Sequence, residues 1–562
     1  MFLLLAQLVA PPLQRGPVRL PSPRGVEERP APGEGRPAPP VELPAESGEP
    51  APSPAPPSGE TAPAAPRSAL PPVQGLTVYG PAELRRILAP CAAIPDPAER
   101  LGRCAEALTS RLVADGYISS RAYAKEETGS LEVVEGRIVE LQVSGGTPWG
   151  ERRVRRLLAP VQGTVLHLPT VQRDLQLLRG QTGLGEVRGR LARLGSDPAQ
   201  ASLTLTLPDG RPPWQGEVSL RNDGNDGSGE ARAHTTLLKP SLAAGGDTLL
   251  LYGELNVSDE GRLGTGITSL SYTYPLSDSL FLTGAFGYSR RNLVELPDPL
   301  DDFSTSQYQA LGQLEWVFRE TLRNRWSVFA GYSNNRSNSY LDGDPLPDGF
   351  PESIREPASG YLRLGLNGSG VGDRTLWSGT AYLLQGIGGA TPATQRQELA
   401  SVGIEPGQAS ALGGVIGGGW AFAPGWQLNL RTGGQVAFQP LTTPMQFTIG
   451  SDVGLRGLPA QLISGDDGWL GTGEVVWTVW RSDRQALQLV PFIGAGWVRT
   501  ELPDVTFSDT VGAGGILARW LQGDSWEVEL GWVEQFSADD NLGEWTDWLL
   551  GQGLYARLQY RF

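Results

Sequence analysis

From Trp214 to the last residue, apolar and polar side chains alternate with a period of two. In residues 426–431, WQLNLR, every second side chain is apolar, and the intervening ones are polar. Successive side chains of a β-strand point to opposite faces, so this pattern predicts strands with one apolar and one polar face. The same alternation recurs at residues 280–288, 326–332, 362–367 and 526–532.

The connections between these strands are of two kinds. Short turns, such as residues 277–279 and 523–524, alternate with long polar loops at 292–306, 338–356 and 441–467. A soluble β-sandwich would also alternate, but short turns at one end and long loops at the other are typical of outer-membrane barrels. We therefore predict a membrane all-β barrel of about 16 antiparallel strands at residues 214–562, wide enough for an aqueous lumen.

Two further features fit a barrel in a membrane. No apolar run reaches the roughly 18 residues of a transmembrane helix, and only helices and closed barrels satisfy the backbone in lipid. The last strand alternates outward-facing apolar residues and stops on an aromatic, with Tyr560 and Phe562 on the outward face. This ending resembles the C-terminal signal of bacterial outer-membrane barrels, so we expect membrane lipid and the barrel-assembly machinery among the partners.

Two small mixed modules precede the barrel. The first, residues 73–145, has helical patterns at 81–88 and from Asp96-Pro97 onward, followed by strands at 130–134 and 137–143. Asp96 is suited to cap the second helix, with Pro97 in its first turn. The second module, residues 146–213, has helices at 151–158 and 170–179 and strands at 186–194 and 202–207. A small sheet leaves an edge to which an extended peptide can add as a further strand.

The N-terminal residues have no pattern of a folded domain. Residues 1–10, MFLLLAQLVA, form an apolar run that fits the hydrophobic part of a secretory signal, or else a short disordered tail. Residues 11–72 contain 20 prolines. Such a composition cannot bury a core, and it predicts a disordered, extended linker.

Composition and charge exclude several classes of function. The net charge of −15 argues against nucleic acid as a partner. The only two cysteines, Cys91 and Cys104, lie in the first module, which favours a disulfide in an oxidising compartment; two buried free thiols are the alternative. His167 and His234 lie far apart without the spacing of metal ligands. Hydrolase and nucleotide-binding motifs are absent from the sequence, so we expect neither an enzyme nor a cofactor.

Residues 73–562 resemble a known family. They are similar to the haemolysin activation/secretion transporters of the ShlB/FhaC/HecB type, the outer-membrane component of two-partner secretion. That superfamily combines periplasmic POTRA domains with a barrel. The segments that carry the resemblance are 115–118, 134–138, 220–224, 227–229, 449–450, 455–458, 464–468 and 492–496.

The resemblance implies a transporter in the cell outer membrane, with its POTRA domains in the periplasm. It would bind an unfolded exoprotein that carries an N-terminal secretion domain, and pass it through the barrel to the cell surface. An insertase of the same superfamily is an alternative, although it would usually carry more POTRA modules. A passive porin or surface barrel is another, although it would have no reason for the two modules.

The family's pore-loop motif corresponds to Leu455, Arg456, Gly457 and Leu458, within a long loop at residues 439–467. In the family, acids on the barrel wall are thought to hold the loop arginine. Strand parity points Glu474 into the lumen, and we expect it to pair with Arg456, with Glu527 or Glu529 as alternatives. Alternatively, Arg456 only anchors the loop and has no part in transport.

The same parity places three further residues of the predicted inner wall toward the loop. They are Phe492, Gly494 and Gly496. The chain departs from the family at two positions, because Leu458 replaces the usual aromatic residue and Gly494 the usual acid.

Overall fold

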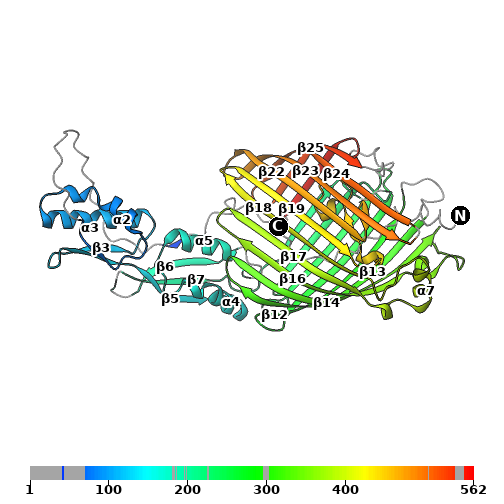
Figure 1. Ribbon diagram of the computed structural model, residues 1–562, viewed down its shortest axis with the longest axis horizontal. Coiled ribbons are helices and arrows are strands. Elements are labelled where there is room, and N and C mark those ends of the chain that lie inside the picture. Colours follow the sequence, from blue (N-terminus) through cyan, green and yellow to red (C-terminus); the bar gives the residue numbers. More distant parts are fainter. Residues whose placement is uncertain are drawn as a thin grey trace. The chain divides into compact units, whose positions relative to one another are not determined.

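The computed structural model describes residues 41–42 and 70–562, except 180–183, 185–186, 195–196, 198, 225–226, 295–302, 504 and 538–549. The predictions for residues 1–10, and for all but a few of residues 11–72, therefore lie outside the described residues. The chain divides into two compact units, one ending at Pro212 and the other containing Pro213–Phe562 (Figure 1). Among the described residues, no helix is both long and apolar enough to cross a membrane.

In the described part of the second unit, sixteen antiparallel strands close into one barrel, as the alternation predicted. The last strand pairs with the first, so the ring has no open edge. A two-residue strand, β15 (Asp344–Pro345), extends the tip of β14. The sixteen strands are β8 (Gln215–Arg221), β9 (Ala231–Pro240), β10 (Thr248–Val257), β11 (Leu263–Pro275), β12 (Leu280–Asn292), β13 (Phe303–Glu320), β14 (Asn324–Leu341), β16 (Ala358–Val371), β17 (Thr375–Gly386), β18 (Ser410–Ala423), β19 (Trp426–Ala437), β22 (Asp467–Arg481), β23 (Gln485–Leu502), β24 (Val505–Gln522), β25 (Trp526–Ser537) and β26 (Leu554–Arg561).

The outer surface of the barrel is apolar, as expected for a face in contact with lipid. Leu430 and Ile493 are 56% and 68% exposed. Aromatic side chains pair across neighbouring strands on this face, for example the stacked rings of Trp426 and Trp477 at 5.1 Å. Phe562 also faces outward, and its backbone exchanges hydrogen bonds of 3.0 Å with Gly216 at the closing strand pair. The chain thus places its apolar residues where a bilayer would cover them.

Connections differ between the two ends of the barrel. At the end where the chain enters β8 they are short, at 241–247, 276–279, 321–323, 372–374, 424–425, 482–484 and 523–525. At the other end they include α6 (Glu352–Arg355) and α7 (Ala393–Ser401). Two loops are shorter than we expected, because β13 and β14 continue through 303–306 and 338–341. Apart from Phe303, Tyr340 and Leu341 these residues are Ser, Thr and Asn, so they show no clear alternation of apolar and polar side chains.

The first small sheet has the strand order β2-β4-β3, covered by two helices. Its elements are β2 (Val73–Gln74), α2 (Pro81–Leu88), α3 (Pro97–Ala114), β3 (Arg121–Lys125) and β4 (Ser130–Val134). Asp96 caps α3 as predicted, because its side chain accepts a hydrogen bond from the backbone N–H of Glu99 at 3.2 Å. β3, which follows α3, was not predicted.

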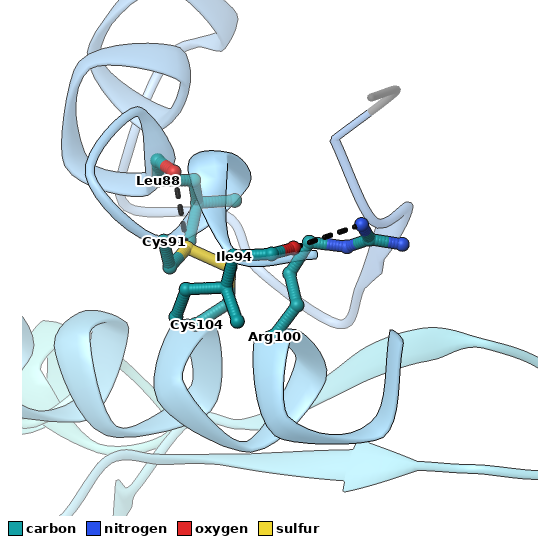
Figure 2. The surroundings of a disulfide bond; sticks show 5 residues. All are labelled: Leu88, Cys91, Ile94, Arg100 and Cys104. Carbon is teal, nitrogen blue, oxygen red and sulfur yellow. Dashed lines mark hydrogen bonds between the residues drawn. A yellow bond between two sulfur atoms is a disulfide. The ribbon is translucent and has the colours of Figure 1, made fainter. Parts of the chain in front are cut away.

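A disulfide joins Cys91 and Cys104 and ties the short 3-10 helix η2 (Cys91–Ala93), which follows α2, to α3 (Figure 2). The two Cα atoms lie 5.3 Å apart, and both side chains are buried in the module's apolar core. Beside the bond, the Arg100 guanidinium donates a hydrogen bond to the carbonyl of Ile94 at 3.2 Å (Figure 2).

The second small sheet has the order β1-β6-β7-β5 and differs from our expectation in two respects. β5 (Arg137–Ser144), which we assigned to the first module, pairs in parallel with β7 (Gln200–Thr206) of the second. β1 (Val41–Glu42) comes from the segment predicted as a disordered linker, and pairs in parallel with β6 (Arg188–Arg193). Strand pairing uses backbone groups, so neither event has a signature in side-chain pattern. The helices α4 (Pro148–Leu158) and α5 (Leu168–Arg179) were predicted.

Candidate functional site

The long loop between β19 and β22 folds back on itself as a compact hairpin. Its arms are β20 (Phe447–Ile449) and β21 (Ile463–Gly465), which pair antiparallel. Between them, the N–H of Ser451 donates to the carbonyl of Pro459 at 2.8 Å, and the N–H of Asp452 donates to Ala460 at 3.1 Å. These bonds satisfy backbone groups within the loop, which lowers the cost of enclosing it in the barrel.

The loop is packed against the inner wall of the barrel by apolar side chains. Leu455 and Leu458 are fully buried. They belong to one apolar cluster with inward-facing residues of the wall, including Phe492, Ala513 and Val533. Because outward-facing neighbours such as Ile493 are exposed, the loop must lie on the lumen side of the sheet.

Gly494 and Gly496 on β23 lack side chains and so leave room for the loop to pack against this strand. A Cβ atom on Gly494 would lie 2.9 Å from Leu455 Cδ2, and one on Gly496 would lie 3.1 Å from Leu455 Cδ1 and 2.6 Å from Ile449 Cδ1. Both distances to Leu455 are shorter than carbon atoms normally approach. The acid that the family usually has at position 494 would therefore occupy the space that Leu455 fills here.

Position 457 requires glycine both for its backbone conformation and because no space is left for a side chain. Its φ of +85° is a left-handed conformation that favours glycine, and a Cβ there would lie 2.5 Å from Val533 Cγ1. Its carbonyl accepts a hydrogen bond of 2.5 Å from the Gln535 side chain on β25. The turn directs the neighbouring arginine toward the wall.

Arg456 lies between two inward-facing carboxylates. Its Nε is 2.9 Å from Glu474 Oε1 on β22, and its Nη1 is 2.6 Å from Glu529 Oε2 on β25. The structure thus brings together Arg456, the acid we expected and one of the two alternatives. The role of the pair in transport is not decided by this contact and stays a prediction.

Glu529 is the centre of a larger charged cluster on the barrel wall. Arg519 on β24 contacts its second oxygen at 2.7 Å, and Arg557 on β26 lies 3.8 Å away. Glu527 is 3.5 Å from Arg519 and 3.3 Å from Arg561. Buried charges are tolerated only when they are paired in this way. The neighbouring arginines keep Glu529 ionised and in place, so it can accept a hydrogen bond from Arg456 of the loop.

A second anchor of the loop was missed by the sequence reasoning. Arg232 on β9 is fully buried, and its guanidinium lies 2.7 Å from Asp452 of the loop and 2.7 Å from Glu254 on β10. Alternation could have placed Arg232 and Glu254 inside the barrel. No local pattern, however, indicates which wall residue meets Asp452.

The two anchors lie on opposite sides of the strand pair that closes the barrel. Arg232 is on the second strand of the ring and Glu529 is on the last but one, with β26 and β8 between them. The N–H of Ala460 also donates to the carbonyl of Gly224, in the connection between β8 and β9, at 3.0 Å. The loop therefore bridges the closing strand pair from inside.

Comparison with known proteins decides the family. The model of the haemolysin secretion/activation proteins ShlB/FhaC/HecB matches residues 200–515, which is more than half of the chain and contains the loop and its wall on β22 and β23. The chain belongs to this family. It is accordingly an outer-membrane β-barrel of two-partner secretion, a system of protein transport, and membership implies a secreted partner protein.

Individual relatives are distant but extensive. The outer membrane transporter CdiB of Dickeya dadantii is 23% identical over 480 residues, covering 78% of each chain. CdiB of Escherichia coli O6:K15:H31 is 24% identical over 470 residues, covering 78% of this chain and 74% of the relative. The solved structure of CdiB from Escherichia coli has a TM-score of 0.56 at 18% identity, covering 90% and 92%. That of CdiB from Acinetobacter baumannii has a TM-score of 0.51 at 14% identity, covering 100% and 96%. These structures share the fold.

Proposed function

We propose that this protein moves a partner exoprotein, unfolded in the periplasm, through the barrel lumen to the cell surface. We propose further that the partner carries an N-terminal secretion domain, and that the two small N-terminal modules are periplasmic POTRA domains that bind it. Family membership supports the export of a partner protein, and the closed barrel with a polar inner wall supports the route.

The observation that carries the proposal is the loop held inside a closed barrel. Apolar packing and ion pairs fasten it to β22–β25 and to β9. The hairpin thus occupies one side of the lumen, where the wall offers both apolar side chains and charged ones. We expect an extended polypeptide to pass beside this hairpin without opening the barrel wall.

Edges of the two small sheets suit the capture of an extended partner. β3 stands at the end of the order β2-β4-β3, and its Tyr123 is 45% exposed. β6 already accepts the short strand β1 from the N-terminal segment. An added strand is held mainly by backbone hydrogen bonds, which require little of the partner's side chains. This mode suits a long partner of varied sequence.

The test is secretion of the large protein encoded next to this one, if that protein has an N-terminal secretion domain. Its amount outside the cell is compared in cells with this protein, without it, and with it restored. We expect loss of secretion without the protein and recovery on restoration. Unchanged secretion in its absence would refute the proposal. A general fall in outer-membrane barrels would indicate an insertase, and reduced uptake of small solutes alone would indicate a porin.

A further inference from the structure

The second small module is basic in an otherwise acidic chain. Residues 146–213 contain ten arginines and no lysine, against five acidic residues, which gives a formal charge of +5. The whole chain has −15, so the remaining residues together carry −20. Five carboxylates cannot neutralise ten arginines, so the module has positive charge that is not balanced within it.

The basic residues are densest on α4. Residues 152–156 read RRVRR, and Arg152, Arg155 and Arg156 are exposed. Spacings of three and four residues place these three on one face of the helix. The opposite face is buried in the module's core, through residues such as Val154 and Leu157. We call the exposed side of α4, with Arg152, Arg155 and Arg156, the arginine face.

Two contacts hold arginines of α4 without neutralising them. Arg155 Nη2 donates to the backbone carbonyl of Val143 on β5 at 3.1 Å. The Arg153 guanidinium lies over the Trp149 ring, 4.9 Å from the ring centroid. Neither contact is with an acid, and Glu151 is the single acid of α4. The helix therefore presents a cluster of positive charge.

The module is tethered to the barrel by a short connection. β7 ends at Thr206, and β8, the first strand of the barrel, begins at Gln215. The eight residues between them span at most about 30 Å when fully extended. Trp214, which is 44% exposed, directly precedes β8 and is of a residue type enriched at membrane–water interfaces. The module thus stays close to the lipid headgroups, whichever way it points.

We infer that the arginine face binds the phosphate groups of anionic phospholipids, in the leaflet of the outer membrane that faces the periplasm. The inference goes beyond export, and it rests only on the proposed periplasmic placement of the module. A guanidinium binds phosphate through two parallel N–H groups and is always charged. Attraction between exposed charges is screened beyond about 8 Å at physiological salt. The short tether is therefore important, because it keeps the face at a high effective concentration near the headgroups.

The arginine face suits lipid better than an acidic segment of the exported partner. The backbone of α4 is hydrogen-bonded within the helix, so it offers an extended chain no main-chain partners, unlike a strand edge. It offers guanidinium groups at a surface, and these suit the phosphates of a bilayer. Binding at this face would restrict rotation of the second module about its tether.

The first test measures the approach of α4 to headgroups in the full-length protein. A fluorophore is attached to Ala159→Cys, an exposed position that continues the arginine face. The control position is Gln142→Cys on β5, exposed and in register with Thr204 rather than with the buried Leu203. Both natural cysteines form the disulfide, so only the introduced thiol reacts. The protein is placed in nanodiscs of phosphatidylcholine, with or without about a third of phosphatidylglycerol, and a nitroxide on the headgroup of a minor lipid quenches nearby fluorophores.

Quenching at position 159 should be at least twofold stronger in the discs that contain phosphatidylglycerol. This difference should disappear in about 0.5 M salt, because salt screens the charges. Position 142 should be quenched weakly and equally in both kinds of disc. Since the quencher is part of the lipid, free phosphate in the buffer cannot produce the signal. Equal quenching at 159 in neutral and anionic discs would overturn the inference.

The second test removes charge from the arginine face. Arg152→Gln with Arg156→Gln should abolish the extra quenching at 159. The matched control, Arg188→Gln with Arg190→Gln, removes two charges from exposed positions of β6 and should keep it. Urea unfolding checks that the module is folded in both variants, and the lipid comparison with the unmodified protein stands by itself if one is not. Extra quenching that survives in the first variant, or is lost in the control, would contradict the assignment to this face.

Neither test needs the partner exoprotein, so both keep their meaning if the proposed function fails. A different occupant would also be recognised. If position 159 is not quenched in anionic discs, but its fluorescence changes when the partner's secretion domain is added, the arginine face binds the partner and the inference is wrong.

Discussion

Removal of the Arg456 side chain should release the loop from the barrel wall while leaving the barrel closed. The guanidinium uses two different edges, with Nε at 2.9 Å from Glu474 and Nη1 at 2.6 Å from Glu529. Alanine removes both contacts. Lysine has a single ammonium group, so it can reach one carboxylate but cannot bind both as the guanidinium does. Arg456→Lys should therefore release the loop to an intermediate extent.

The size of the effect follows from burial. Breaking a buried ion pair by removing one partner destabilises by about 3–5 kcal/mol. The Arg456 side chain is 18% exposed, and Glu529 keeps Arg519 at 2.7 Å, so the lower end of this range applies. About 3 kcal/mol corresponds to roughly a 100-fold rise in the released population, since about 1.4 kcal/mol is tenfold. For lysine we expect about half of this free energy, or roughly tenfold.

Release can be measured as thiol labelling of the loop. Both natural cysteines are in the disulfide, so the background variant Ser451→Cys introduces a single free thiol in the loop. The rate of maleimide labelling at low reagent reports the released population. Arg363→Ala is the matched control, because Arg363 is an inward arginine on β16 that stacks over Phe329, on the opposite wall. It should leave labelling unchanged.

Two results would count against the reasoning. If Arg456→Ala labels at the rate of the unmodified loop, the ion pairs do not hold the loop in place. If labelling rises about 100-fold while partner secretion is unchanged, Arg456 only anchors the loop, and its transport role is wrong.

Three further predictions concern other parts of the molecule. Gly494→Val should weaken docking of the loop by about 1–3 kcal/mol, because the added side chain would overpack against Leu455, and thiol labelling of the loop should rise. The control is Gly312→Val, where a Cβ would meet nothing within 4 Å, and this variant should leave labelling unchanged. Burial raises the pKa of Asp466 from 3.8 to about 6. The docked loop therefore binds this proton more tightly than the released loop, so docking should weaken as the pH rises from about 4 to about 6, by at most about tenfold per pH unit, and should change little above that. Asp466→Asn should remove this pH dependence of docking. Maleimide labelling of the loop thiol is measured at each pH and divided by the labelling rate of unfolded protein at the same pH. The same pH dependence in the variant would show that Asp466 is not the group responsible. Cys91→Ser should destabilise the first module by about 3 kcal/mol, given the sequence separation of 13 between the two cysteines. Urea unfolding of the variant is compared with that of the unmodified protein with and without reductant. Equal midpoints for the variant and the oxidised protein would contradict the prediction.

Much of the barrel was predictable because its signal is local. A strand between lipid and water must alternate, so the period of two identified the strands and their faces, and loop lengths identified the two ends. The helix from Pro97 was predictable for the same reason, since Asp96 and Glu99 interact within one turn. The prediction failed where the alternation is weak, as in residues 303–306 and 338–341 at the ends of β13 and β14, which are mostly Ser, Thr and Asn.

Other features depend on which distant segments meet. Alternation placed Glu474 and Glu529 in the lumen, but only the pairing of β22 to β25 into one wall, and the folding of the loop against that wall, bring both to Arg456. Backbone pairing alone joins β5 to β7 and gives no side-chain pattern. Asp452 of the loop contacts Arg232 on β9, beyond the closing strand pair, and no pattern in the sequence predicts this contact. The sequence thus determined the strands, their faces and which charged residues point into the lumen, and the tertiary fold decided which of these charges became partners, because it sets which distant segments meet.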